Sequence, residues 1–180
     1  MASATVYTFD IQLADVDRGV YETLALRVAR QPSETAEYLL TRVLAYCLEY
    51  GEGLAFSRGL AEPDEPALAV RDLTGALHTW IDIGAPDAAR LHKASKAAPR
   101  VAVYTHKDPD VLLRQCAVER IHRGESIRLH GFDRALITGL AARLQRRTAF
   151  SLSVADRHLH VSLGDETLSG ELTTHSLAAR

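Results

Sequence analysis

The chain has 180 residues, which is enough for one domain with a sizeable core and short for two. Hydrophobic residues make up 47% and charged residues 24%, the proportions of an ordinary soluble globular protein. The formal net charge of −2 argues against a general nucleic-acid coat protein, which would be basic, so any contact with nucleic acid has to be local.

The two cysteines and the N-terminal segment indicate the cellular compartment in which we expect the protein. Cys47 and Cys116 lie far apart in apolar, helix-like stretches without metal-ligand spacing, which predicts two reduced core thiols. The N-terminus lacks a charged segment followed by an apolar one, and no apolar run approaches the roughly 18 residues that a membrane span needs. We therefore expect a cytoplasmic protein with no membrane partner.

The hydrophobic pattern changes period within the first fifty residues. Residues 5–13 and 22–30 alternate between apolar and polar side chains, which predicts two half-buried strands joined as a hairpin. Between Pro32 and Gly51 the apolar residues recur at helical spacing, with Pro32 suited to the start of a helix and Gly51 to its end.

From residue 54 onward predicted strands and helices alternate. In chain order they are a short strand at 54–58, strands over 67–73 and 76–84 joined by a turn at Gly75, a helix over 86–98, a strand over 100–106, a helix over 108–122, a strand over 126–132, a helix over 133–147, and strands over 149–156, 158–164 and 166–176. This order favours a mixed or parallel sheet with helices on its faces, and both chain ends add antiparallel strands. We expect an α/β fold, or α+β on a stricter definition, in one domain over residues 1–180.

Three short motifs resemble sites but lack their context. Ser57 in AFSRG lacks the first glycine of a nucleophile elbow, and a loop rich in proline and acids follows it instead of a helix. His158 and His160 share one strand face, but no further ligand stands near at zinc spacing. The basic run RLQRR, residues 143–147, ends a predicted helix, where positive charge is favourable in itself. Solvated surface is the simpler interpretation of the two histidines and of the basic run, and a catalytic Ser57 is not expected.

Asp82 is a stronger candidate for a site. It shares a strand face with His78 and Trp80 and stands two residues before the strand ends at Gly84. A carboxylate there is costly to bury unless it is paired or binds a metal. The alternative is a strand-end aspartate that accepts hydrogen bonds from nearby backbone N–H groups.

Glu65 offers a second carboxylate for the same place. If the two strands pair as a hairpin through Gly75, the start of the first strand lies beside the end of the second, and Glu65 approaches Asp82. Two carboxylates brought together repel each other unless a cation lies between them. Magnesium prefers one or two carboxylates with water and phosphate oxygens, so this pair suits it.

Glu37 and Lys93 extend this group. Glu37 flanks the apolar stripe of the first helix, although a first-turn acid also stabilises a helix N-terminus by itself. Lys93 lies on the helix after Asp82, where small alanines let the helix lie close to the sheet and the long lysine stem reach over the strand end. The alternative for Lys93 is a solvated surface lysine.

Several blocks of residues also occur together in a known family. They are ADVDR (14–18), ARQPSET (29–35), FSRGL (56–60), DEP (64–66), WIDIGAPDAAR (80–90) and KA (93–94). On these blocks the chain resembles the YaeQ family of small bacterial proteins, most strongly from about residue 5 to 105. The family usually has Glu where this chain has Asp82 and His where it has Gln31, so the carboxylate is kept but shortened.

The YaeQ family is similar in fold to a compact variant of the PD-(D/E)xK restriction-endonuclease-like superfamily. The resemblance implies a single-domain mixed sheet flanked by helices, an acid at one strand start that Glu65 matches, and an acid on the next strand that Asp82 matches. It also implies a glutamate on the first core helix, here Glu37.

The lysine of the superfamily usually stands two residues after the second acid, where this chain has Gly84. Some members carry it on the following helix, and Lys93 fits that position, with Lys96 and Arg90 as substitutes.

The working hypothesis is a Mg²⁺- or Mn²⁺-dependent phosphodiesterase that acts on nucleic acid as an endonuclease-like enzyme. Glu65 and Asp82 would hold the metal with Glu37 nearby, and the metal would polarise the phosphate and lower the pKa of a bound water. Lys93 would orient that water or stabilise the transition state. Further phosphate contacts would come from Arg58, Arg71, Arg90 and Lys96.

The rival hypothesis is a nuclease-like fold that has lost catalysis and binds nucleic acid or a protein partner. The mild acidity of the chain and the missing lysine at position 84 favour it. Convergence of Glu65, Asp82 and Lys93 would favour the enzyme, whereas an arginine that neutralises the acids would favour the binding protein. A third possibility is a structural role in buried ion pairs.

Overall fold

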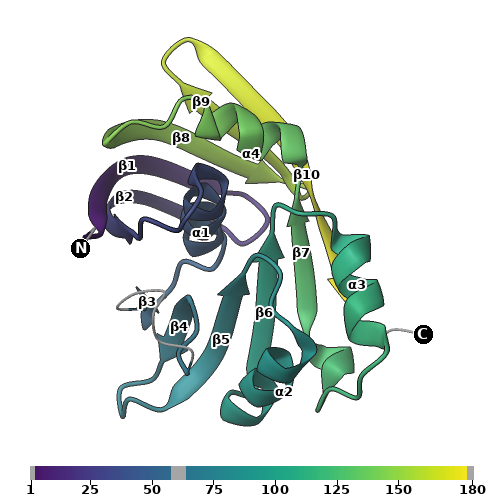
Figure 1. Cartoon of the computed structure of the whole chain (residues 1–180). Helices are drawn as coiled ribbons and strands as arrows, with labels where there is room; N and C mark the ends of the chain where they lie inside the picture. Colours follow the sequence, from purple (N-terminus) through teal and green to yellow (C-terminus); the bar gives the residue numbers. More distant parts are fainter. Residues whose placement is uncertain (1–2, 58–63, 178–180) are drawn as a thin grey trace. The chain divides into compact units, whose positions relative to one another are not determined.

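The computed structural model describes residues 3–57 and 64–177. The chain divides into two compact units, one made of Met1–Leu40 and Phe132–Leu172 and the other of Thr41–Gly131 and Thr173–Arg180. Each unit combines strands with helices (Figure 1), so the predicted α/β class is confirmed. A single domain over residues 1–180 stays a prediction.

The first unit is built on a five-stranded sheet. Its strands are β1 (Thr5–Asp15), β2 (Val20–Arg30), β8 (Arg147–Ala155), β9 (His158–Leu163) and β10 (Glu166–Ser176), in the order β2-β1-β8-β9-β10. Neighbouring strands are antiparallel except β1 and β8, which run parallel. The antiparallel strands predicted at the two ends of the chain are therefore confirmed. The parallel pairing of β1 with β8 joins these two groups of strands into one sheet.

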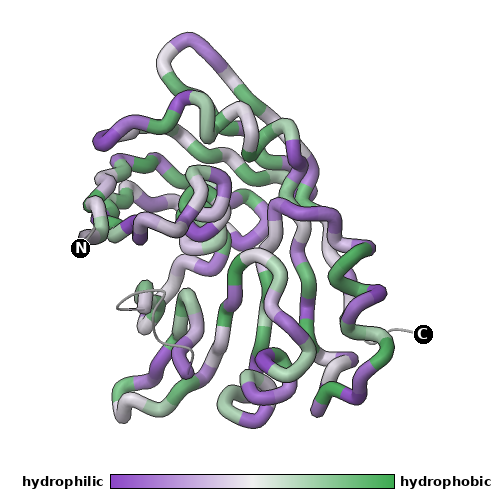
Figure 2. Tube along the Cα trace, in the orientation of Figure 1, coloured by the Kyte–Doolittle hydropathy of each residue, from purple (hydrophilic) through white to green (hydrophobic). Residues whose placement is uncertain are grey.

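Alternating side chains set the inner face of this sheet. Phe9, Ile11 and Leu13 of β1 are buried, while Gln12 is exposed. Figure 2 shows hydrophilic and hydrophobic residues alternating along the strands. The helix α4 (Arg134–Ala141) lies against β10, where a side chain at Gly170 would overlap Asp133. Glycine is thus required for the close approach of helix and strand.

The turns at one end of this sheet explain the ADVDR block. Asp15 accepts hydrogen bonds from the backbone and the guanidinium of Arg18 (3.2 and 2.8 Å). Asp17 accepts from the backbone N–H groups of Asp156 and Arg157 (2.7 and 3.0 Å), both in the left-handed region. The Arg157 and Asp156 bonds hold the pKa of Asp17 below its usual value, so this carboxylate joins the β1–β2 turn to the β8–β9 turn.

The helix predicted over 133–147 is wrong at its C-terminal end. α4 ends at Ala141, and Arg147 already begins β8. The backbone N–H of Thr8 donates to the carbonyl of Arg146 (2.9 Å), so pairing with β1 draws the segment out of the helix. The run RLQRR therefore does not cap a helix.

The second unit contains the alternating middle of the chain. Its elements are α1 (Ala36–Leu48, which begins in the first unit), β3 (Leu54–Phe56), β4 (Leu68–Arg71), β5 (Leu77–Ile83), α2 (Ala88–Ala97), β6 (Arg100–Thr105), α3 (Pro109–Ala117), a 3-10 turn at Gly124–Ser126 and β7 (Arg128–Phe132). The strand order is β7-β6-β5-β4-β3, with β5, β6 and β7 parallel and the others antiparallel. The predicted hairpin through Gly75 is confirmed.

Helices α2 and α3 cover one face of this sheet. Trp80, Leu91, Val103, Leu112 and Leu129 belong to the core cluster formed there. Both cysteines are buried and free, as predicted. No helix within residues 3–57 and 64–177 is long and apolar enough to cross a membrane.

The helix predicted over 108–122 is also shorter in the structure, where α3 ends at Ala117. Arg123 donates hydrogen bonds to the carbonyls of Ser95 and Ala98, so the chain turns toward the end of α2 instead of continuing the helix.

A polar network is built around Glu49 just after α1. Arg100 donates to both Glu49 carboxylate oxygens (2.8 Å each), and the Tyr104 hydroxyl donates to one of them (2.7 Å). The His130 ring stacks on Tyr104 with centroids 4.6 Å apart. Burial alone would raise the pKa of Glu49, but Arg100, Tyr104 and the charge of His130 together hold it below its usual value.

We expect Glu49→Gln to lower the free energy of unfolding by about 2 kcal/mol at pH 7, because charge-assisted hydrogen bonds are lost. A folded-state pKa below the usual value means that ionised Glu49 stabilises the fold above that usual value, and that this contribution disappears as pH falls through the folded-state pKa. The deficit of the variant should therefore shrink in acid. Urea unfolding across pH checks this, with exposed Glu52→Gln as the control. Equal stability of both variants at pH 7 would contradict it.

Candidate functional site

Asp82 lies near the end of β5 and is 2% exposed. Arg90 donates from Nε to its Oδ2 (2.7 Å) and from Nη2 to its Oδ1 (3.0 Å). Both oxygens of the buried carboxylate therefore accept hydrogen bonds from one guanidinium. This bidentate geometry is the strong form of an arginine–carboxylate pair.

Arg90 also contacts two other groups. Its Nη2 donates to the main-chain carbonyl of Glu65 (2.8 Å), and its guanidinium carbon lies 5.4 Å from the centroid of the Trp80 ring. One side chain thus joins α2, β5 and the segment that precedes β4.

The local sequence accounts for the return of Arg90 to Asp82. Gly84 ends β5 with φ +89°, a left-handed conformation that favours glycine. Asp87 then begins α2 by accepting a hydrogen bond from the backbone N–H of Arg90 (2.8 Å). The lysine position of the superfamily thus has a left-handed glycine, and the cation arrives from the next helix.

Glu65 lies beside the end of β5, as the hairpin predicts. Leu68 at the start of β4 is paired with Ile81, and Ala69 with Trp80. Residues directly opposite each other share a sheet face. Glu65 lines a hollow of about 380 Å³ together with Ala69, the residue that is paired with Trp80.

Other side chains of this hollow are Ser57 and Arg71. Arg71 also donates to the carbonyl of Gly75 (3.2 Å). The hollow is therefore lined by residues of acidic, hydroxyl and basic type, and its Glu65 is linked to Arg90 through the main-chain carbonyl.

Lys93 has a different partner from the one expected. It forms an ion pair with Asp64, and both side chains are largely exposed. The hydrogen bond and charge of Lys93 hold the pKa of Asp64 below its usual value. The cation on Asp82 is thus Arg90, and the catalytic role of Lys93 stays a prediction. Lys96, in the last turn of α2, is exposed.

The remaining predicted residues are less informative. Glu37 lies in the first turn of α1, in the part that belongs to the first unit, so its metal role stays a prediction. Arg58 lies outside the described residues.

The described residues do not bring the predicted magnesium ligands together. Within residues 3–57 and 64–177 there is no cluster of three His, Cys, Asp or Glu side chains that could hold a metal. Asp82, the best placed predicted ligand, has both oxygens bonded to a guanidinium. A metal held by Glu65, Asp82 and Glu37 therefore stays a prediction.

The sequence predicts Arg90 only as a phosphate contact and as a substitute for Lys93, whereas in the structure it is the partner of Asp82. Two signals in the sequence mark it: it is the third residue after the helix-capping Asp87, and Trp80 lies on the same face as Asp82. A buried tryptophan offers a ring against which a guanidinium can stack.

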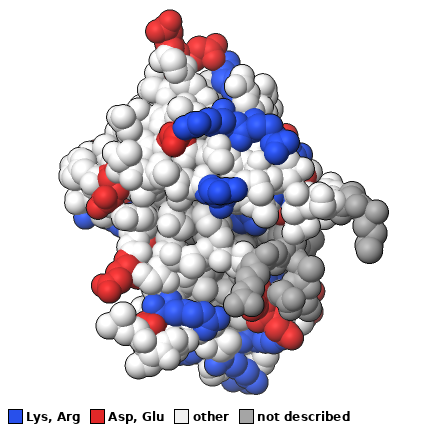
Figure 3. Space-filling view, turned by 90° about the vertical axis from the view of Figure 1, so that its left-hand side faces the viewer, with Lys and Arg blue, Asp and Glu red and all other residues white. Residues whose placement is uncertain are grey.

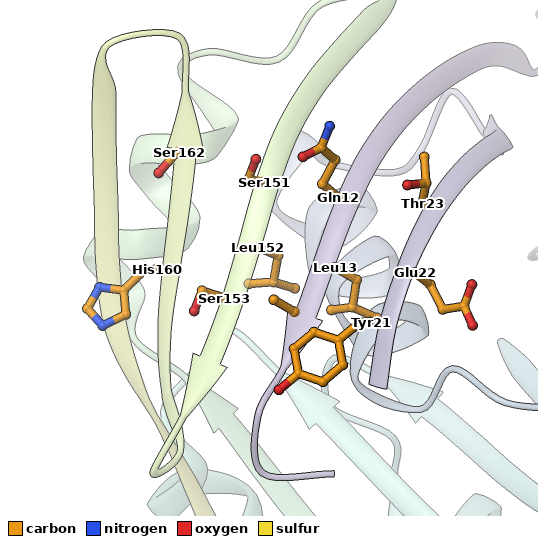
Figure 4. A pocket seen from close by; sticks show the side chains of 11 residues that line it. Gln12, Leu13, Tyr21, Glu22, Thr23, Ser151, Leu152, Ser153, His160 and Ser162 are labelled. Carbon is orange, nitrogen blue, oxygen red and sulfur yellow. The ribbon is translucent and has the colours of Figure 1, made fainter. Parts of the chain in front are cut away.

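The first unit has a groove of about 700 Å³ on the outer face of its sheet (Figure 4). Short side chains such as Ser151 and Ser153 form its floor, and Tyr21 and His160 stand on either side of Ser153. His160, noted for a possible zinc site, is here one wall of a mainly neutral hollow.

Surface charge is mixed. Figure 3 shows Lys and Arg side chains interspersed with Asp and Glu on the face that it draws. This distribution agrees with the net charge of −2 and leaves only local basic patches for an anionic partner.

We expect Arg90→Ala to lower the free energy of unfolding by about 3 kcal/mol, because it leaves the buried Asp82 carboxylate unpaired. Asp82→Asn combined with Arg90→Ala should recover part of this loss, since the charge is removed with its partner. Denaturant unfolding of the variants measures both values, with Arg114→Ala on exposed α3 as the control. If Arg90→Ala were as stable as Arg114→Ala, the pair would not stabilise the fold.

The sequence is similar to those of known proteins. The family model described as YaeQ protein matches residues 1–172. The uncharacterized protein YaeQ of Escherichia coli (strain K12) is 39% identical over 103 residues, and that of Salmonella typhi is also 39% identical over 103 residues. Each match covers 57% of this chain and 57% of the length of the relative.

Two solved structures share the fold. The crystal structure of YaeQ protein from Pseudomonas syringae superposes with a TM-score of 0.86 at 31% identity and covers 95% of each chain. That of YaeQ protein from Xanthomonas axonopodis pv. citri gives a TM-score of 0.88 at 31% identity and covers 98% of this chain and 100% of the other. The chain belongs to the YaeQ family.

Proposed function

We propose that this protein binds nucleic acid through phosphate contacts on the α2 side of its second unit and does not cleave the strand. The observation that carries the proposal is the Arg90 guanidinium on both oxygens of Asp82. A divalent cation would compete with the guanidinium for the same oxygens and be repelled by its charge. Catalysis by the predicted metal would first require this pair to open.

Displacing Arg90 would be costly. Its third bond, to the Glu65 carbonyl, and its contact with Trp80 would be lost together with the ion pair. Breaking a largely buried ion pair generally destabilises a protein strongly. The pair therefore supports a structural role for Asp82 and Arg90. The nuclease hypothesis had Asp82 as a metal ligand and Arg90 as a phosphate contact.

The surface around this pair supports an anionic ligand. Lys96 is exposed at the end of α2, Lys93 is exposed beside Asp64, and Arg71 lines the hollow next to Glu65. Such side chains neutralise phosphates without reading bases. The resemblance to a nuclease superfamily points to nucleic acid as the ligand class.

Fluorescence anisotropy with labelled single-stranded and duplex oligonucleotides tests the proposal. We expect the same affinity in EDTA and in Mg²⁺, with the strand intact after incubation. Lys93→Gln combined with Lys96→Gln should weaken binding about tenfold at low salt and reduce the salt slope by about 1.4 for a single strand. Lys107→Gln, an exposed lysine after β6, is the matched control and should bind as the wild type.

Two results would contradict the proposal. Cleavage that requires Mg²⁺ or Mn²⁺ and disappears in Asp82→Asn, but persists in Lys107→Gln, would make the protein a phosphodiesterase with Asp82 at its metal. Absence of binding to every strand at low salt would exclude nucleic acid as the ligand.

A further inference from the structure

A second basic feature lies in the first unit, at the start of β1. The guanidinium carbon of Arg30 lies 5.6 Å from the centroid of the Tyr7 ring, and that of Arg146 lies 5.7 Å from it. Arg30 ends β2, and Arg146 immediately precedes β8. Three strands that are neighbours in the sheet therefore bring two cations to one aromatic ring.

Hydrogen bonds to neutral groups fix both arginines. Arg30 donates from Nε to the carbonyl of Glu34 (3.0 Å) and from Nη1 to the Tyr7 hydroxyl (3.2 Å). Arg146 donates from Nε to the carbonyl of Val6 (3.1 Å), while its own carbonyl accepts from Thr8 N–H (2.9 Å). The two guanidinium groups are thus held in place before any ligand arrives, which lowers the entropic cost of binding.

The charges of these two arginines are not compensated. Elsewhere in this unit, Arg18, Arg143 and Arg147 each form an ion pair with a carboxylate. Across residues 3–57 and 64–177, no Asp or Glu lies within ion-pair distance of Arg30 or Arg146. Two cations around one ring repel each other, and an anion between them would relieve that repulsion.

Donors remain available for such an anion. The Nη2 groups of Arg30 and Arg146 have no partner in the described part of the chain. The Tyr7 hydroxyl accepts from Arg30 and keeps its own proton, which it can donate to a ligand. The cluster therefore offers two guanidinium edges and one phenol.

We propose that Tyr7, Arg30 and Arg146 form a binding site for a phosphate monoester. Guanidinium edges match phosphate oxygens in bidentate geometry. A phosphate monoester carries nearly two negative charges at pH 7 and so balances the two arginines. A carboxylate or a phosphodiester carries only one charge and leaves half of the repulsion in place.

The Tyr7 ring limits what else the site recognises. Because both guanidinium groups lie over this ring, it is engaged in cation–π contacts. Less of the ring is then left for stacking a base, so the phosphate group is the part of a ligand that we expect the site to recognise. That group could belong to a small phosphorylated molecule or to the terminal phosphate of a nucleic-acid strand.

This inference does not rest on the proposed function. Its residues belong to the first unit, whereas Arg90, Lys93 and Lys96 belong to the second. Variants of one site can thus be compared with variants of the other.

Isothermal titration of the full chain with inorganic phosphate tests the site directly. We expect Arg30→Gln combined with Arg146→Gln to weaken binding at least about tenfold, since charge-assisted hydrogen bonds are removed. Tyr7→Phe, which removes only the hydroxyl, should weaken it less. Binding to the wild type should also weaken as pH falls below about 6, where the phosphate takes up its second proton.

Arg27→Gln is the matched control. Arg27 is exposed on β2, three residues before Arg30, so strand alternation points it to the opposite sheet face. It should bind phosphate as the wild type does. Equal binding by Arg27→Gln and the Arg30/Arg146 double variant, or no binding by the wild type, would overturn the proposal. If the double variant has a lowered melting temperature, Tyr7→Phe decides, because it leaves both arginines in place.

A second titration distinguishes the two sources of the phosphate. A 5′-phosphorylated oligonucleotide that binds at least about tenfold more tightly than inorganic phosphate and than its 5′-hydroxyl counterpart would identify a strand end as the ligand. Equal affinity for inorganic phosphate and the phosphorylated strand would identify a small phosphorylated molecule. Both results require that the Arg30/Arg146 double variant loses the binding.

Discussion

The second unit depends on one guanidinium. Arg90 bonds both oxygens of Asp82, the carbonyl of Glu65 and, through its π contact, the ring of Trp80. These groups come from β5, α2 and the segment before β4, which the ion pair of Lys93 with Asp64 also joins to α2. The carboxylate is buried at the end of a core strand, where it would be costly without a cation. The pair therefore adds a polar contact to the apolar packing of α2 on the sheet and engages both oxygens of Asp82.

Charge compensation separates the structural residues from the candidate binding residues. The carboxylates of Asp82 and Glu49 are largely buried and are each matched by an arginine in bidentate geometry. Such pairs hold a fold together and leave little capacity for a ligand. Arg30 and Arg146 differ, because within the described residues only neutral groups fix them in place. A phosphate is the anion that would complete this cluster.

The candidate site was only partly predictable. The hairpin through Gly75 brought the Glu65 segment beside Asp82 because antiparallel register follows from the turn. The sequence assigned the cation to Lys93, since a long lysine stem over small alanines resembles the known motif. Arg90 instead reaches Asp82, because the left-handed turn at Gly84 and the helix start at Asp87 place the first turn of α2 over the strand end. The spacing of residues along the chain does not give the direction in which that turn sends the helix.

The sequence by itself determined the α/β class, the order of its elements, the apolar faces of β1 and β2 and membership of the YaeQ family, because periodicity and motif order are local properties. Only the tertiary structure decided that β1 runs parallel to β8. This pairing goes with an α4 that ends at Ala141, earlier than the sequence predicts. The tertiary structure also decided that Arg90 neutralises Asp82 while Arg30 and Arg146 share the ring of Tyr7. Strand pairing and ion pairs join residues far apart in the chain, and their geometry depends on turns and packing that no short pattern records.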